Sequence, residues 1–408
     1  MTADSGCPFR SCLPFLKVSL TFFAISIYNR AAEWIWAKQT AAHHKGEFAV
    51  KSSKRSTILA VSAVLLSATA LTGCSGQFAA ANTAKTVIKQ ASQPKGHLVL
   101  YSAEGYDASM AQAFQKKTGI VVSLVDDSTG NIVARMEAER SNPHWDVAWF
   151  DGDSTMQTLD NQGMLLRGFT PADMRNYTPL GLSLLPKDHA YFPTGITAAA
   201  AIAYNTRLVP QKNAPTSWQS LLSPYFKNSV AMNNPAISGP TYPFVAGVIQ
   251  QMGVARGEAY FKNLKANGLK VFPTNGVTLQ ALEEGQVKAI MIQDSALTKA
   301  KVSGEPIKLV YPKSGVYMLP GVLAIDSHAP DMAAAKAFAA FVLSPQGQRI
   351  MTNPKNGGGD SYFNPIIKGI RPDSARPQAG IHWVRVNAVS AARQFNSIQN
   401  WFHENIVQ

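Results

Sequence analysis

Cysteine is scarce in this chain, and none lies in its long C-terminal part. The three cysteines are Cys7, Cys12 and Cys74 in a chain of 408 residues. Without a cysteine after residue 74, the main body can hold no disulfide, no thiolate metal site and no cysteine nucleophile.

Motifs of other common function classes are missing as well. No Lys/Arg cluster with interleaved aromatic residues is present, so we expect no nucleic-acid binding. Neither Gly-x-Ser-x-Gly nor His-Glu-x-x-His occurs, which removes two signatures of hydrolases. We therefore expect no catalytic residues, no cofactor and no metal ligands of these kinds.

What the chain does have is an ordinary globular composition. It is 46% hydrophobic and only 15% charged, and its length is sufficient for two domains. The formal net charge of +13 mildly favours anionic ligands or surfaces.

The sequence pattern between residues 51 and 74 predicts an export signal. Basic residues at 51–55 precede an apolar run, Thr57–Ala70, that is too short to span a membrane comfortably. Leu71-Thr-Gly-Cys74 then resembles a bacterial lipobox. The resemblance implies a lipoprotein signal peptide at 51–73, acylation (palmitate) of Cys74, and a lipid-anchored protein in the cell envelope, facing the periplasm or the exterior.

The segments on either side of this signal have simpler interpretations. Signals normally start a chain, so we interpret residues 1–50 as an extension from a start assigned too early, with Val50 as the true first codon. Residues 74–95, rich in Ala, Thr, Ser and Gln, are interpreted as a flexible tether.

Apolar β-branched segments alternate with amphipathic ones in the body, which predicts a parallel α/β sheet. Strands are predicted at His97–Tyr101, Ile120–Val125 and Asp146–Phe150, and helices at Ala108–Lys117 and Ile132–Arg140. Ligands bind at the carboxyl ends of the strands of such sheets.

Small polar residues follow each predicted strand, at that same sheet edge. They are Ser102, then Ser128, Thr129, Gly130 and Asn131, and then Asp151. Hydroxyls and free N–H groups at the start of a helix suit an anion. The alternative is that Ser128 or Thr129 only caps its helix and that Asp151 is a turn residue.

Several segments in order resemble bacterial extracellular solute-binding proteins of ABC importers, in the branch that includes ferric-iron and 2-aminoethylphosphonate binders. They include Leu98–Ala103, Lys117–Val122, Asp146–Asp151, Pro215–Leu222 and Phe341–Gln348. The resemblance implies a monomer that captures a small-molecule solute and delivers it to a cognate ABC permease in the membrane.

The resemblance also implies the fold: a two-lobe periplasmic-binding-protein-like (type II) α/β architecture with two interlobe crossings. We place the crossings near Thr194–Tyr204 and Pro312–Leu323. Lobe 1 is then residues 96–193 and 318–408, lobe 2 is residues 194–317, and closure of the lobes buries the ligand. The tail, Gly369–Gln408, is expected to pack on lobe 1 as helix.

Candidate ligand groups come from both lobes. Ser238, Gly239 and Thr241 precede a predicted helix, Phe244–Met252, and Thr197 lies at a crossing. Two helix N-termini facing each other would bind a compact oxyanion. Asp151, Asp294, and Asp126 or Asp127 could accept an ammonium group, which with the resemblance points to 2-aminoethylphosphonate or a related organophosphonate. The alternative for Asp294 and Ser238 is a helix cap.

Two other functions stay open. Ferric-iron binders of this branch present a Tyr-Tyr pair after a second-lobe strand, whereas Lys288–Ile292 is followed by Gln293 and Asp294. An enzyme on the same two-lobe fold is the alternative from a different class. Porphobilinogen deaminase resembles that fold but needs a cysteine for its cofactor.

Overall fold

The computed structural model describes residues 96–408. The predicted start extension, the signal peptide, Cys74 and the tether lie outside the described residues. Within residues 96–408, no helix is both long and apolar enough to cross a bilayer.

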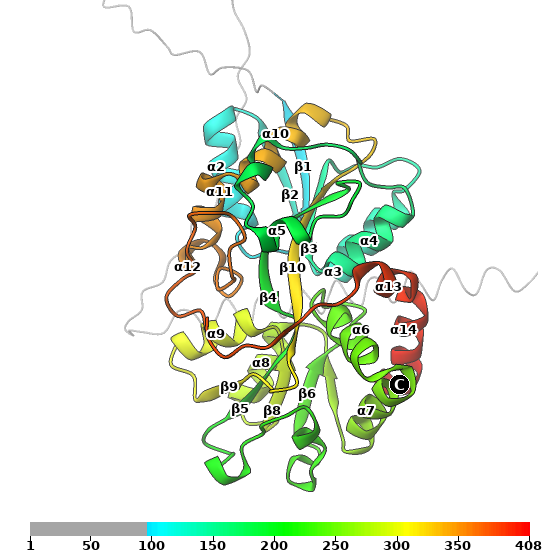
Figure 1. Cartoon of the computed structure of the whole chain (residues 1–408), viewed down its shortest axis with the longest axis vertical. Helices are drawn as coiled ribbons and strands as arrows, with labels where there is room; N and C mark the ends of the chain where they lie inside the picture. Colours follow the sequence, from blue (N-terminus) through cyan, green and yellow to red (C-terminus); the bar gives the residue numbers. More distant parts are fainter. Residues whose placement is uncertain (1–95) are drawn as a thin grey trace, which may run out of the picture. The chain divides into compact units, whose positions relative to one another are not determined.

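The first lobe is built on a mixed sheet in the strand order β11-β10-β3-β1-β2, with β4 paired to β10 (Figure 1). β1 runs parallel to β2 and β3, whereas β10 is antiparallel to β3 and β4. Its elements are β1 His97–Ser102, α2 Asp107–Thr118, β2 Val121–Asp126, α3 Thr129–Ala138, β3 Val147–Asp151, α4 Asp153–Asn161, α5 Pro179–Ser183, β4 Tyr191–Ala198, β10 Val316–Ile325, α10 Met332–Leu343, α11 Pro345–Met351 and α12 Pro354–Gly357.

The second lobe is built on a five-stranded sheet in the order β7-β6-β8-β5-β9. β6 is parallel to β7 and β8, and β5 is antiparallel to β8 and β9. Its elements are β5 Ala201–Asn205, β6 Val230–Asn233, α6 Thr241–Met252, α7 Val254–Ala266, β7 Lys270–Phe272, α8 Asn275–Glu283, β8 Ala289–Ile292, α9 Asp294–Val302 and β9 Ile307–Val310.

The central strands, such as β3, β5 and β8, are buried on both faces, as the apolar runs predict, whereas the edge strands β2 and β7 are partly exposed. On β3, Val147 and Trp149 enter one core while Ala148 and Phe150 enter the other. The predicted strands and helices of this region are confirmed, although α3 begins at Thr129, so part of the predicted turn is the first helical turn.

The chain passes between the sheets from β4 to β5 and again from β9 to β10. β4 pairs with β10 up to Ala198, so the second sheet begins after Ala198 rather than at residue 194. The return strand β10 begins at Val316.

The tail departs from the sequence-based expectation. After β11 (Trp383–Val384) and α13 (Ala388–Arg393), α14 (Phe395–Phe402) buries Ile398 and Phe402 in the core beneath α6 and α7 of the second lobe. Figure 1 shows this red segment beside α6 and α7. The tail therefore makes a third passage between the lobes, because its aromatic face completes the second-lobe core.

Candidate functional site

A cavity of about 240 Å³, which we call the cleft cavity, lies between the two lobes. Turns that follow strands of both sheets form its wall. The first lobe contributes Ala103, Asp127, Ser128, Thr129, Asp151 and Asp360, and the second contributes Ile237, Ser238, Gly239, Pro240, Thr274, Asn275, Gly276, Gln293 and Ala296. None of these described lining residues is basic.

The two turns that we predicted to hold an anion between them instead touch each other. The N–H of Gly130 donates to the carbonyl of Ile237 across the lobes at 3.0 Å. Gly239 packs against the Thr129 side chain, and a Cβ there would lie 2.9 Å from the Asp151 carbonyl oxygen. Ser128 caps α3 by accepting from the N–H of Asn131. The start of α3 is therefore occupied by the protein itself.

Another helix start does face the cavity. No side chain caps α8, and its first-turn residues Asn275 and Gly276 line the cavity wall. A Cβ on Gly276 would meet no atom within 4 Å, so the space beside it is open. Unpaired N–H groups and the positive end of the helix dipole suit an anionic group.

Carboxyl groups of the first lobe also lie at the site. Asp151 accepts from Gln293 Nε2 at 2.6 Å through Oδ2, and Asp360 accepts from the N–H of Gly105 at 2.7 Å. Glu104 is 2% exposed. Burial, and then the neighbouring carboxyl of Asp360, raise the pKa of Asp151 to about 7. Burial also raises the pKa of Glu104 well above its usual range.

Gln293 joins the lobes at the centre of the site. Its Nε2 donates to Asp151 and also to Thr197 Oγ1 at 3.1 Å, and its Oε1 accepts from Asn275 at 3.0 Å. One side chain thus connects the acidic side of the cavity to the start of α8.

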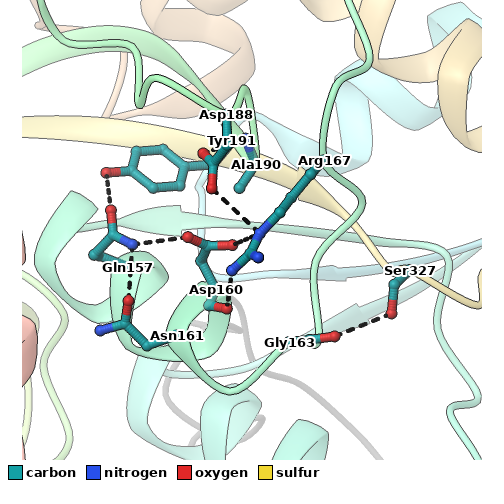
Figure 2. Close-up of polar contacts among 9 residues, drawn as sticks. All are labelled: Gln157, Asp160, Asn161, Gly163, Arg167, Asp188, Ala190, Tyr191 and Ser327. Carbon is teal, nitrogen blue, oxygen red and sulfur yellow. Dashed lines mark hydrogen bonds and ion pairs between the residues drawn. The ribbon is translucent and has the colours of Figure 1, made fainter.

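A buried polar network holds α4, which follows Asp151 after one residue. Asp160 accepts from Gln157 at 2.8 Å and from Arg167 Nε at 2.7 Å, and the Tyr191 hydroxyl donates to Gln157 at 3.3 Å. Figure 2 shows these contacts, which tie α4 to β4 behind the cavity. They are structural, since none of these four residues lines the cleft cavity.

The structure brings some of the predicted site residues together and separates others. Ser128, Thr129, Asp151, Ser238 and Gly239 line the cleft cavity, and Thr197 lines the small cavity next to it. Ser102 lies beneath the site, where it accepts from the N–H of Glu104. Gly130, Asn131 and Thr241 do not line either cavity.

Asp294 has a different role from the one predicted. Its Oδ1 accepts from the N–H of Ala198 at 2.9 Å, and its Oδ2 lies 2.7 Å from Arg376 and accepts from Tyr311. Both oxygens are therefore used within the protein, and the side chain caps no helix. We withdraw Asp294 from the set of ligand groups.

Sequence reasoning missed Glu104, Asp360, Gln293 and Asn275. Glu104 lies in the turn after the first strand, so its place at the sheet edge could have marked it. Asp360 follows three glycines, Gly357–Gly359, a pattern that indicates a flexible connector rather than a binding site. Its proximity to Glu104 depends on packing between segments some 250 residues apart, which no local pattern reveals.

There are two further cavities. One of about 670 Å³ lies between α4, the segment 183–188 and the tail. One of about 230 Å³ lies between α3 and α14; it shares Thr129, Ser238 and Gly239 with the cleft cavity and is also lined by Gly130. Within residues 96–408, no group of three or more His, Cys, Asp or Glu residues is placed to hold a metal ion.

Comparisons with known proteins agree with this architecture. The profile of the bacterial extracellular solute-binding protein family matches residues 109–375. A putative 2-aminoethylphosphonate-binding periplasmic protein of Salmonella paratyphi A is 24% identical over 243 residues, covering 58% of this chain and 68% of that protein. The major ferric iron-binding protein of Neisseria meningitidis serogroup B is 27% identical over 291 residues, covering 66% and 85%.

A solved structure shows the same fold. The periplasmic binding protein AfuA from Actinobacillus pleuropneumoniae, with exogenous fructose-6-phosphate bound, superposes with a TM-score of 0.70 at 21% identity. The match covers 77% of this chain and 99% of that one. The predicted two-lobe α/β fold is thereby confirmed.

Proposed function

Because the chain belongs to the bacterial extracellular solute-binding protein family, we propose that its cleft cavity binds a compact solute carrying both an ammonium and an oxyanion. Our first candidate is 2-aminoethylphosphonate. The observation that carries the proposal is one cavity lined by carboxyl groups of the first lobe and by the uncapped start of α8 in the second lobe.

The acidic side favours a cation. Asp127, Asp151 and Asp360 line the cavity, and none of its described lining residues is basic. Lys299 acts on Asp360, whereas Asp151 is influenced by other carboxyls and by Gln293. Because a buried carboxylate is unfavourable without a partner, a solute ammonium would supply the positive charge that Asp151 lacks.

The helix start accounts for the other half of the solute. Asn275 and Gly276 at the first turn of α8 offer backbone N–H groups, and Ser128 and Thr129 add hydroxyls on the facing wall. A phosphonate accepts hydrogen bonds from such donors without needing a basic side chain. This assignment moves the anion from the facing starts of α3 and α6, which the sequence favoured, to the start of α8.

The cavity's size and lining favour a small organic solute over iron. Its volume of about 240 Å³ lies below the range of cavities that hold drug-sized ligands, and no tyrosine lines it. We therefore rank a ferric-iron binder below an amine-bearing solute. The known relatives are solute-binding transport proteins, and we propose no enzymatic role.

Calorimetry on the purified chain tests the proposal. We would titrate 2-aminoethylphosphonate, inorganic phosphate, putrescine and ferric citrate in turn. Binding of the aminophosphonate, with phosphate much weaker, is the expected result. Preference for putrescine would mean that only the acidic half is used, and binding of ferric citrate alone would overturn the proposal.

One variant tests the contribution of the start of α8 to phosphonate binding. Gly276→Ala should fold normally because the added methyl meets no atom within 4 Å. It should weaken 2-aminoethylphosphonate by roughly tenfold, since the methyl crowds the phosphonate's N–H donors, and leave putrescine unaffected. Equal losses for both solutes would argue against a phosphonate at α8.

We also propose that acylation of Cys74 anchors the protein. The predicted result is incorporation of labelled palmitate by cells that express the chain. Cys74→Ser should abolish the label and release the protein into the soluble fraction. Retention of the label in that variant would overturn the proposed site.

A further inference from the structure

A second, much smaller cavity adjoins the cleft cavity on its acidic side. It has a volume of about 10 Å³, and we call it the side cavity. Its lining residues are Glu104, Tyr106, Asp151, Gly195, Thr197, Gln293, Gly321, Asp360 and Phe363. Asp151, Gln293 and Asp360 also line the cleft cavity, so the two spaces share a wall. The side cavity has room for one group about the size of a water molecule.

Three carboxyl groups line this space, and each has one oxygen that accepts no hydrogen bond from a described residue. Asp151 Oδ2 and Asp360 Oδ2 are held by Gln293 and by the N–H of Gly105. No described residue donates a hydrogen bond to their Oδ1 atoms. Glu104 is 2% exposed, and its buried Oε1 has no hydrogen-bond partner among the described residues. A buried acceptor without a partner is costly, which indicates a missing donor.

The absence of a side chain at Gly321 keeps this space open. Gly321 lies on β10, between the carboxyl groups of the first lobe. A Cβ there would lie 3.0 Å from Thr194 Oγ1, 3.3 Å from Glu104 Oε1 and 3.4 Å from Asp151 Oδ1. A single point is thus within contact distance of both carboxyl oxygens, and only glycine leaves it free.

From this geometry we infer that the side cavity is a subsite for one primary ammonium group, which reaches Glu104 Oε1 and Asp151 Oδ1 from the cleft cavity, with the Asp360 carboxyl on the shared wall. The inference rests on the proposed function, because it specifies where the amine of the solute lies. A primary ammonium has three N–H donors, enough for both of these carboxyl oxygens and one further acceptor.

The subsite also defines a specificity. A trimethylated amine has no N–H donor and is far larger than a water molecule, so it cannot enter a space of about 10 Å³. Burial and the neighbouring carboxyls raise the pKa values of Glu104 and Asp151, so these groups tend to hold protons when no ligand is bound. A bound ammonium would take the place of those protons. The protein should therefore select primary amines over their N-methylated forms.

Calorimetry on the purified full chain tests the subsite with three probes. They are 2-aminoethylphosphonate, its N,N,N-trimethyl analogue and ethylphosphonate, which has no amine. We expect the primary amine to bind at least roughly tenfold more tightly than either other probe, as loss of a hydrogen-bonded charge implies. Equal affinities for the primary and trimethylated amines would overturn the subsite.

Two variants assign the selectivity to named groups. Glu104→Gln keeps the shape but removes the charge, and Gly321→Ala fills the space. Each should reduce the preference for the primary amine over ethylphosphonate by roughly tenfold, whereas a merely structural defect would weaken all probes equally. Glu404→Gln, which alters an exposed glutamate at the far end of the chain, is the matched control.

The outcomes separate the subsite from the proposed function. If wild-type protein binds 2-aminoethylphosphonate but Glu104→Gln keeps the full preference, the subsite is wrong and the proposed function stands. If wild-type protein binds neither 2-aminoethylphosphonate nor putrescine, the proposed function fails and the subsite with it. Should either variant not fold, the probe series on wild-type protein still decides.

Discussion

Arg376 in the tail lies 2.7 Å from Asp294 at the start of α9, with both side chains fully buried. Asp294 also accepts from the N–H of Ala198, the last residue of β4, and from the hydroxyl of Tyr311, which follows β9. Those two residues stand at the two passages between the lobes. One carboxylate therefore ties the tail to both hinge segments.

Removing the arginine should destabilise the protein strongly. Arg376→Met leaves Asp294 as a buried charge without a counter-ion, and we expect a loss of about 3–5 kcal/mol in the free energy of unfolding. Denaturant unfolding followed by circular dichroism measures it. The double variant Arg376→Met/Asp294→Asn should recover part of the loss, because no isolated charge remains.

The double variant also shows whether the loss in unfolding free energy comes from the unpaired charge of Asp294. Equal unfolding free energies for the single and double variants would mean that loss of packing, rather than an unpaired charge, explains the cost.

Gly130 should be necessary for the lobes to approach as they do here. A Cβ on Gly130 would overlap the carbonyl of Ala236, and the N–H of Gly130 bonds Ile237 across the cleft. Gly130→Ala should weaken the binding of 2-aminoethylphosphonate by roughly tenfold, because overpacking at the contact between the lobes costs about 1–3 kcal/mol. Small-angle scattering should show less compaction on adding the solute.

Ala138→Ser, an exposed change on the same helix, is the control for Gly130→Ala. Wild-type affinity and compaction in Gly130→Ala would mean that the ligand-bound lobes do not meet at this turn.

Ligand affinity and stability should respond to pH in opposite directions. The pKa of Asp151 is raised from 3.8 to about 7, with Glu104, Asp360 and Asp294 facing it. The native protein therefore holds more protons than the unfolded chain between those values, and its stability without ligand should fall as the pH rises through that window. Affinity for an ammonium should rise over the same window, because the carboxylates then ionise.

Thermal unfolding with and without 2-aminoethylphosphonate, between about pH 5 and pH 8, measures both effects. The ligand-induced rise in Tm should be largest at the highest pH. Asp151→Asn should flatten the dependence of unliganded stability on pH. A ligand effect that is independent of pH in wild-type protein would contradict an ammonium bound at these carboxyls.

The network in Figure 2 should contribute to stability without affecting binding. Asp160 is almost fully buried and accepts from Gln157 and Arg167, so Asp160→Ala removes both hydrogen bonds, although Gln157 keeps Asn161 and Arg167 keeps Asp188 as a partner. We expect a loss of about 1–3 kcal/mol in the free energy of unfolding, with unchanged solute affinity.

Asp188 provides the comparison, since it also contacts Arg167 but is 39% exposed. Asp188→Ala should cost less than about 1 kcal/mol. Similar losses in both variants would show that burial of Asp160 is not what makes its contacts valuable.

The class of fold and the sheet edge that carries the candidate site could both be predicted from local sequence patterns. Alternating apolar segments specify strands and helices locally, and parallel strands present their following turns at one edge. Ser128, Thr129 and Asp151 could therefore be assigned to one region before any packing was known. Their residue types also suited a polar ligand.

Which of these residues line the cleft cavity depends on how distant segments of the chain pack together. The contact of Gly130 with Ile237 closes the start of α3, and the ion pair with Arg376 removes Asp294 from the cleft. Glu104 and Asp360 meet because distant segments pack together, and α14 joins the second lobe because its aromatic face fits that core. Such pairings depend on long-range burial and charge compensation, which local sequence patterns do not encode.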